Sequence, residues 1–223
     1  MEVHILAYRQ TDKVAARLAD TRRSILDAAR GLVAEGGFAA VQMSEVAKKA
    51  GVATGTLYRY FSSKEALCRH VFREVSAREM GKLAEIASGD EAASERLVKV
   101  LETFAGRAVR GRRLAYALLA EPLDVNLAEE RSFFRRTHAE IFAGILEDGI
   151  ENGELPKIDV RIAAACIAGA IPTALIGPLA PESHELDSNP DRVVAEIVKF
   201  CLAGAGIAAP QTQQKTTERR KTA

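Results

Sequence analysis

Residues 51–67 read GVATGTLYRYFSSKEAL, and this stretch decides the fold of the first part of the chain. Its first glycine ends a preceding helix, because glycine readily adopts the backbone conformation that closes a helix. A tight turn follows, and a short helix is expected over 54–61 with Leu57 and Phe61 on its buried edge at i, i+4 spacing. Two tyrosines on either side of Arg59 lie off that edge. The stretch therefore predicts a turn and a short helix that presents aromatic and basic side chains to a partner.

Two further helices precede this turn. The first is expected to begin at Asp20 or Thr21, which are good N-caps, and to end at Gly36-Gly37. Apolar residues in between recur on one helical face. A short second helix is expected over 44–50. The first helix braces the short pair that follows it.

Two short helices that are joined by a glycine-containing turn and braced by a third form the helix-turn-helix plan. In this plan the second helix of the pair enters the major groove of DNA and the first crosses the backbone. The sequence thus assigns 44–50 as the support helix and 54–61 as the reading helix. A longer fourth helix is expected to start at a capping box, with Ser62 as the N-cap and Glu65 three residues later.

The composition of the reading helix suits a groove. Small residues at its N-terminus let the backbone approach DNA, and the free N–H groups there favour phosphate. The side chains that carry polar tips toward phosphates or base edges come next. The small residues are Thr54, Gly55 and Thr56, and the side chains with polar tips are Tyr58, Arg59 and Tyr60. Two alternatives stay open: Tyr58 packs against the first helix, and Arg59 is an ordinary surface charge.

One series of residues runs through the predicted helices: Phe38-x-x-Val41, Met43-x-x-Val46-Ala47 and Ala50-Gly51-Val52-Ala53-x-Gly55-Thr56-Leu57-Tyr58-x-Tyr60-Phe61-x-x-Lys64-x-x-Leu67. This series resembles the tetracycline-repressor (TetR) family of bacterial regulators. The resemblance covers about residues 21–70. It implies that Tyr58, Tyr60 and Lys64 contact phosphate and that Ser44 faces the DNA. It also implies that Thr54, Gly55, Thr56 and Arg59 lie in or beside the groove. An ordinary solvated lysine is the alternative for Lys64.

Two positions depart from the family pattern. Gln42 stands where many relatives have a Thr or Ser N-cap, so Ser44 is expected to cap a slightly shorter second helix. Gly55 replaces the longer polar residue that is common in relatives. Base reading is therefore expected to depend on Thr54, Thr56 and Arg59.

The rest of the chain predicts longer helices, and the fold class is all-α, with a three-helix N-terminal domain and a helical effector-binding and dimerisation domain. The expected long helices cover 91–109, 111–120, 127–152, 159–179 and 190–207. The expected divisions are an N-terminal extension (1–20), the helix-turn-helix domain (21–68), the effector and dimerisation domain (69–209) and a disordered basic tail (210–223). For the extension, disorder or an extra helical turn is favoured over a minor-groove arm.

Stripes of small and apolar residues on two C-terminal helices predict a homodimer. Small residues allow close helix approach, and two helices from each subunit close a four-helix interface. The predicted interface residues are Ala163, Ile167, Ala170, Ala174, Val194, Ile197, Val198 and Cys201. An ordinary core within one chain is the alternative. Dimerisation also doubles the few contacts that a single helix-turn-helix makes.

A ligand pocket needs mostly apolar walls with a few convergent polar groups. The predicted lining residues are Phe104, Tyr116, Leu119, Glu121, Phe134, His138, Phe142 and Ile171. For His138, a satisfied core histidine is the alternative. The resemblance implies a small-molecule effector, whose identity the sequence does not give. No catalytic or metal motif is present, and no cofactor is expected.

Composition agrees with an intracellular nucleic-acid-binding protein. The chain has 223 residues, 48% of them hydrophobic, and a net charge of +1. Residues 1–78 carry 13 Lys and Arg against 8 Asp and Glu, whereas the remainder is acidic. A basic segment on an acidic body suggests that one end meets a polyanion. The three cysteines are far apart, which favours a reducing, cytoplasmic compartment, and neither a signal peptide nor a membrane span is predicted.

These observations predict a homodimeric transcriptional regulator, most simply a repressor, that a small effector releases from a near-palindromic site on double-stranded DNA. A DNA-binding protein without an effector is the main alternative, and an all-α enzyme is a minor one. The operator, and the choice between repression and activation, lie beyond the sequence.

Overall fold

The computed structural model describes residues 2–122 and 125–207, with side chains at 12–122 and 127–207. Within these ranges the chain is helical and contains no strand, so the all-α prediction is confirmed. The elements are α1 (Glu2–Gly36), the 3-10 helix η1 (Phe38–Ala40), α2 (Met43–Lys49), α3 (Thr54–Tyr60), α4 (Lys64–Ala87), α5 (Ala93–Arg110), α6 (Arg112–Leu119), α7 (Val125–Glu151), α8 (Val160–Leu179), α9 (Glu185–Ser188) and α10 (Pro190–Gly204). The predicted tail, 210–223, lies outside the described residues.

The described residues form two hydrophobic cores. We call residues 21–72 the head and residues 73–207 the body. Helix α4 runs from one to the other: it gives Leu67 and Phe72 to the head core, and Met80 and Leu83 to the body core. The predicted boundary between residues 68 and 69 therefore falls inside a helix. Phe134 of the body packs against both cores.

The head folds as its glycines and apolar spacing predict. Helix α1 is followed by Gly37 at φ 76°, and the turn between α2 and α3 contains Gly51 at φ 67°; both are left-handed conformations that favour glycine. Leu57 and Phe61 are 0% and 2% exposed, which confirms their prediction as core residues.

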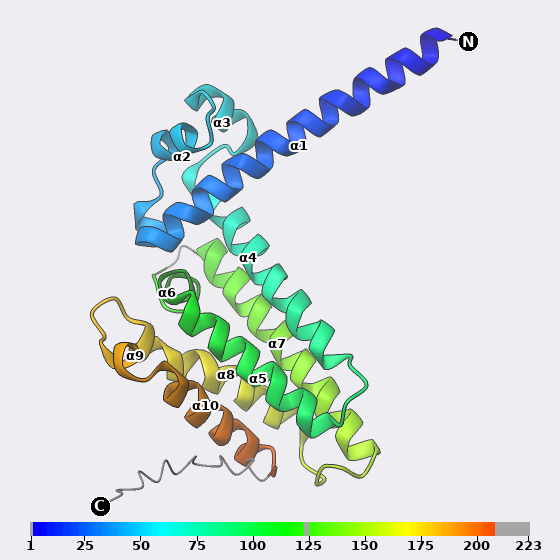
Figure 1. The fold of residues 1–223 in the computed structure, drawn as a ribbon, viewed down its shortest axis with the longest axis vertical. Coiled ribbons are helices and arrows are strands. Elements are labelled where there is room, and N and C mark those ends of the chain that lie inside the picture. The colour runs from blue at the N-terminus through cyan, green and yellow to red at the C-terminus, as the bar shows by residue number, and fades with distance from the viewer. Residues whose placement is uncertain (1, 123–124, 208–223) are drawn as a thin grey trace, which may run out of the picture.

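Three predictions about helix starts are wrong. Helix α1 passes through Asp20 and Thr21 without a break, because no glycine or proline interrupts that region. Its N-terminal part projects beyond the rest of the head (Figure 1). The N-cap of α4 is Ser63 and not Ser62: the Ser63 hydroxyl accepts a 3.1 Å hydrogen bond from the Ala66 N–H. Helix α2 begins after Gln42, whose side chain makes no capping bond, so Ser44 lies inside the helix.

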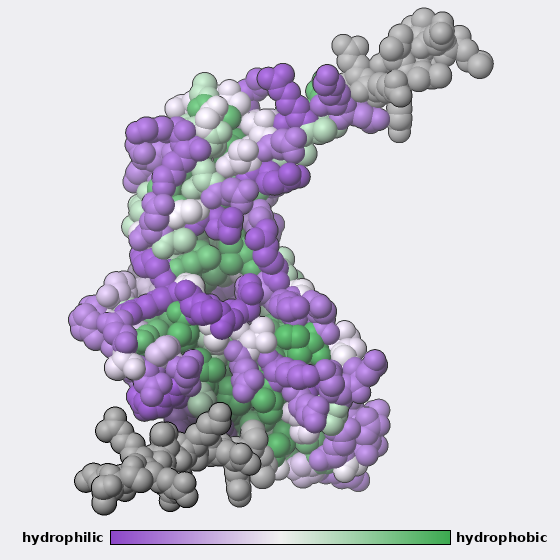
Figure 2. All heavy atoms as spheres, viewed as in Figure 1, coloured by the Kyte–Doolittle hydropathy of each residue, from purple (hydrophilic) through white to green (hydrophobic). Residues whose placement is uncertain are grey.

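Helices α4 to α10 form the body, where α8 packs against α7 and α10. Within the described residues, α8 is the one helix long and apolar enough to cross a membrane by length and composition. Core helices of soluble proteins pass the same test, and one side of α8 packs into the body core through Ile167, Ile171 and Leu175. On the face in Figure 2, apolar surface gathers over the body and where head and body meet, whereas the coloured portion of α1 that leads out from the head is mostly polar.

Candidate DNA-binding and ligand-binding sites

The exposed face of the head is formed by α3 and the start of α2. Thr54, Gly55 and Arg59 are exposed, and Tyr58 is 49% exposed although its neighbour Leu57 is fully buried. Ser44 is also exposed, on α2. The i, i+4 pair on the inner side of α3 thus fixes the helix and leaves these side chains free to meet a partner.

Three predicted DNA-binding residues are less exposed. Thr56 is half-buried, and Tyr60 packs against the head core. Lys64 is half-buried at the first turn of α4, where its ammonium donates a 3.3 Å hydrogen bond to the Ala39 carbonyl. Each of these side chains therefore has less surface to offer a phosphate than Tyr58 has.

On the two short helices of the head, Lys48 in the last turn of α2 and Arg59 in the last turn of α3 are exposed. Neither has an ion-pair partner within the described part of the chain. Lys49, by contrast, is paired with Glu35 at 2.8 Å. Exposed cations without a counter-charge favour an anionic partner.

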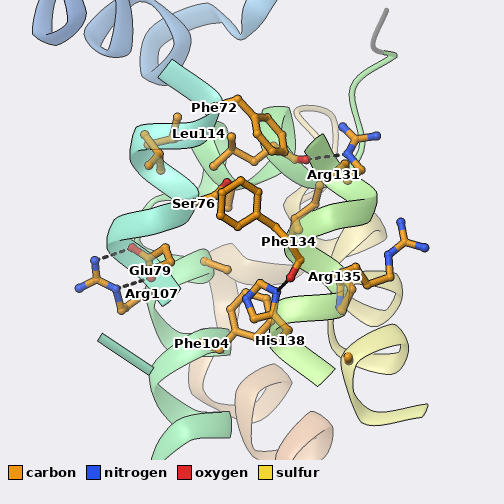
Figure 3. A pocket seen from close by; sticks show the side chains of 17 residues that line it. Phe72, Ser76, Glu79, Phe104, Arg107, Leu114, Arg131, Phe134, Arg135 and His138 are labelled. Carbon is orange, nitrogen blue, oxygen red and sulfur yellow. Dashed lines mark hydrogen bonds and ion pairs between the residues drawn. The ribbon is translucent and has the colours of Figure 1, made fainter. Parts of the chain in front are cut away.

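The body contains a cavity of about 140 Å³ between α4, α5, α6, α7 and α8 (Figure 3). Most of its lining side chains are apolar. Four of the eight predicted pocket residues line it: Phe104, Leu119, Phe134 and His138. Further lining residues include Phe72, Ser76, Glu79, Arg107, Leu114, Leu118, Arg131, Arg135, Ala168 and Pro172.

The other four predicted pocket residues do not line this cavity. Phe142 and Ile171 are 0% exposed and belong to the body core. Tyr116 lies under the guanidinium of Arg113, 5.8 Å from the ring centroid. Glu121 turns toward the head instead. Phe142, Ile171 and Tyr116 share helices with the cavity but not its walls, and Glu121 lies just after α6.

The sequence analysis missed the wall contributed by α4. Ser76 and Glu79 are polar residues at i, i+3 spacing on α4, among apolar residues of the same helix. This spacing could have indicated that α4 contributes a polar part of the cavity wall. Arg131 was also missed, although it lies on the same face of α7 as Phe134 and His138.

The charged groups at the cavity differ in how they are paired. Arg107 donates two hydrogen bonds to Glu79, at 2.6 and 2.7 Å, and this carboxylate raises the Arg107 pKa. Arg131 donates to backbone carbonyls at the end of α6, and burial and the charge of Arg135 lower its pKa. Arg135 is exposed, has no ion-pair or hydrogen-bond partner within the described part of the chain, and points away from the cavity in Figure 3. Only this rim cation is free for an anionic ligand group.

His138 is the polar group set deepest in the cavity wall. Its Nδ1 lies 2.8 Å from the Phe134 carbonyl oxygen, and its ring stacks on Phe104 with centroids 4.6 Å apart. Burial lowers the His138 pKa to about 4, so the ring is neutral at neutral pH. Its other nitrogen, Nε2, is buried and has no hydrogen-bond partner among the described residues.

Contacts continue from the cavity to the head. Phe72 lies 6.1 Å from Phe134 and 6.4 Å from Phe38, measured between ring centroids. Glu121 accepts a 2.9 Å hydrogen bond from the Phe38 N–H and also forms an ion pair with Arg113.

Gly37 precedes this contact. A Cβ atom at residue 37 would overlap the charged ends of both Arg113 and Glu121. The absence of a side chain there is what lets the ion pair approach the Phe38 N–H.

Apolar side chains are exposed on α8 and α10. Ile162 and Ile176 on α8 are 57% and 39% exposed, and Phe200 on α10 is 69% exposed. Cys166 on α8 is also exposed. Burial raises the pKa of the Cys201 thiol to about 11, so that thiol stays protonated.

The predicted dimer residues occupy different environments. Ala174 is exposed, and Ala163, Ala170 and Val194 are half-buried. The remaining four are buried in the core of their own chain and have little surface to offer a partner: Ile167, Ile197, Val198 and Cys201. The core of one chain accounts for their periodicity, and their place in a dimer interface stays a prediction. The described residues contain no group of three or more His, Cys, Asp or Glu side chains able to hold a metal ion.

Residues 25–71 match a family described as "Bacterial regulatory proteins, tetR family". The chain is 33% identical over 150 residues to the fatty acid metabolism regulator protein of Bacillus subtilis (strain 168), covering 66% of this chain and 77% of that one. It is 32% identical over 148 residues to the HTH-type transcriptional repressor KstR2 of Rhodococcus jostii (strain RHA1), covering 64% and 72%. The crystal structure of FadR from Bacillus subtilis in complex with stearoyl-CoA superposes with a TM-score of 0.65 at 28% identity, over 79% of this chain and 97% of that one.

Proposed function

The chain belongs to the tetR family of bacterial regulatory proteins, and from this premise we propose that it is a repressor whose effector is an acyl thioester of coenzyme A. That it is a DNA-binding regulator under the control of a small molecule follows from the family. The observation that carries the proposal is the apolar cavity in the body, which shares Phe72 and Phe134 with the contacts that lead to the head. We place the protein in the cytoplasm and assign it no enzymatic activity.

In this proposal α3 lies in the major groove of the operator. Thr54, Gly55 and Arg59 face base edges, and Thr56 lies beside them. Tyr58 and the tip of Tyr60 donate to phosphates, and Ser44 and Lys64 contact the backbone on either side. Lys64 exchanges its long bond to the Ala39 carbonyl for a charged acceptor, which is the stronger interaction.

The dimer is formed by α8 and α10 of two copies. Ile162, Ile176 and Phe200 replace the four buried residues of the initial prediction, because they expose apolar surface that water disfavours. Ala174 and the half-buried alanines let the helices approach closely. Twofold symmetry then places two heads on the halves of a near-palindromic site.

An acyl chain suits the apolar walls, and Arg135 at the rim suits the anionic part of coenzyme A. The support from relatives is the stearoyl-CoA complex of a 28% identical FadR. A cavity of about 140 Å³ is close to the roughly 150 Å³ that holds a benzene molecule, so a long chain has to displace the lining helices. The ligand then binds the displaced arrangement of helices better than the present one, and such a difference in affinity between two states is what release from DNA requires.

Movement reaches the head through α6 and α4. Arg131 holds the carbonyls of Leu118 and Glu121 at the end of α6, and the Glu121 carboxylate holds the Phe38 N–H. A ligand that moves α7 also moves Arg131, and the hydrogen bonds of Arg131 and Glu121 transmit this movement to Phe38 in the head. Displacement of Phe134 also removes its contact with Phe72 on α4. The spacing of the two heads changes as a result.

The proposal is tested by operator release. DNA fragments that the protein itself selects from a random library are bound, and stearoyl-CoA is added, with coenzyme A alone and stearate as controls. We expect stearoyl-CoA to release the DNA. Ala168→Leu fills the cavity wall and should bind DNA without responding, whereas Ala84→Leu on the exposed side of α4 should respond normally. Unchanged DNA affinity across acyl chain lengths would overturn the acyl-CoA effector and favour regulation without one.

A further inference from the structure

The inference concerns one buried atom in the cavity wall, Nε2 of His138. The position of the ring is fixed by its stacking on Phe104 and by the 2.8 Å contact between Nδ1 and the Phe134 carbonyl. A carbonyl oxygen only accepts hydrogen bonds, so the proton must sit on Nδ1. In a neutral imidazole with this tautomer, Nε2 is an acceptor and cannot donate.

No donor of the described chain reaches this acceptor. Nε2 is buried without a hydrogen-bond partner. The charged neighbours are engaged elsewhere: Arg107 with Glu79, and Arg131 with the carbonyls of α6. Glu79, as a carboxylate, has no hydrogen to donate. A buried acceptor without a donor is costly, so a ligand that supplies one gains affinity.

We propose that His138 is the specificity-determining residue of the cavity, and that its Nε2 accepts a hydrogen bond from a hydroxyl or amide N–H group of the effector. This proposal rests on the proposed function, in that the cavity is taken as the effector site. In an acyl thioester of coenzyme A, this donor is a hydroxyl on the acyl chain or an amide N–H of the coenzyme A arm, placed beside the Phe104 ring. A purely hydrocarbon ligand fills the same walls but leaves the acceptor unpaired.

Two pairs of small probes distinguish the two donor chemistries and fit the cavity size. In the first pair, 4-methylphenol carries a hydroxyl where p-xylene carries a methyl group. In the second pair, N-methylpentanamide carries an amide N–H where methyl pentanoate carries an ester oxygen. Calorimetric titration of the full-length protein gives the affinity ratio within each pair.

The matched variant is His138→Phe, which keeps a ring to stack on Phe104 and removes the acceptor. We expect the donor-bearing probe of at least one pair to lose roughly 3- to 10-fold of its advantage in this variant, the range of a single hydrogen bond. Phe133→Leu, on the same helix but outside the cavity, should leave both ratios unchanged. The pair that responds identifies the donor as hydroxyl or amide.

A second readout needs no variant and serves if His138→Phe does not fold. With ¹⁵N-labelled histidine, the Nε2 resonance of the wild type should shift with the donor-bearing probe and stay in place with its partner. Equal ratios in wild type and variant, an unmoved resonance, or no binding of any probe would each overturn the assignment. Operator release by stearoyl-CoA is scored separately, so a donor preference without release would refute the effector and leave the role of His138 intact.

Discussion

The head and the body are both helical bundles around aliphatic cores, but they leave different groups unpaired. On the surface of its short helices, the head keeps two exposed cations without an ion-pair partner among the described residues, Lys48 and Arg59. Four buried side-chain nitrogens of the described residues also lack a hydrogen-bond partner. Those of Arg30, Arg69 and Arg113 can only donate, and Nε2 of His138, in the body, is the acceptor among them. A surface cation attracts any polyanion, and shape then selects among them, whereas a buried acceptor discriminates between ligands that differ by one hydrogen. The four predictions below test this division, from the largest effect to the smallest.

The first prediction tests whether the two cores are separate. Phe61→Ala should cost ~3–5 kcal/mol of head stability, because it removes a buried ring and leaves a cavity. Amide exchange should then accelerate at Leu57 while protection persists at Leu146 in the body core. Phe142→Ala should give the reverse pattern. Loss of protection in both cores with either variant would mean that head and body unfold as one unit.

The second prediction concerns pH and the body interior. The His138 pKa falls from 6.5 to about 4 on folding, so between these values the unfolded chain binds more protons than the native one. Stability contributed by the neutral ring is fully present above pH 6.5 and is lost as pH falls toward 4. The shift corresponds to roughly 3 kcal/mol. The free energy of unfolding, measured with urea at several pH values from 4 to 7, should therefore rise more steeply with pH for wild type than for His138→Phe. Equal pH dependence in the two proteins would contradict the prediction.

The third prediction concerns the junction between head and body. Glu121→Ala should cost ~1–3 kcal/mol, because the Phe38 N–H and Arg113 both lose their partner. Glu121→Gln keeps an acceptor for the N–H and should cost less. Exchange at the Phe38 amide reports the bond directly. If glutamine proved as damaging as alanine, the charge and not the hydrogen bond would be the stabilising element.

The fourth prediction concerns the surface cations of the head. Arg59→Ala should weaken operator binding by ~1 kcal/mol and relax specificity, because its guanidinium faces base edges. Lys64→Ala should lower the salt dependence by about one released ion, because its ammonium contacts a phosphate. Tyr58→Phe and Lys64→Ala should weaken binding at all sequences. Lys82→Ala, in the body and paired with Glu85, should leave both quantities unchanged. Anisotropy titrations across salt concentrations measure them, and wild-type curves for all three head variants would refute the contact assignments.

The head could be predicted closely because its determinants are local. Gly37 and Gly51 mark the turns, and the i, i+4 pair Leu57 and Phe61 identifies the inner face of α3. The error at α1 arose because a good N-cap residue at 20 or 21 does not start a helix when the preceding residues are themselves helical.

The cavity and the dimer surface depend on distant segments and were predicted only in part. Phe134 and His138 were found from the face they share on α7, but Phe142 continues that face one turn into the core. Periodicity shows that a stripe is buried and not which chain buries it. Ile197 was therefore assigned to a partner when it serves its own core, and the exposed Phe200 beside it was overlooked.

Gly37, Arg113 and Glu121 lie far apart in the sequence yet have to be inherited together. A side chain at residue 37 would displace the ion pair, and the left-handed backbone there disfavours any replacement. If the Arg113–Glu121 ion pair is lost, the steric reason for glycine at residue 37 disappears, and only the positive φ of the turn still favours glycine there. In any lineage that descends from this chain, the first of the three to drift frees the other two. An alignment of descendants should therefore show the three positions changing as a group.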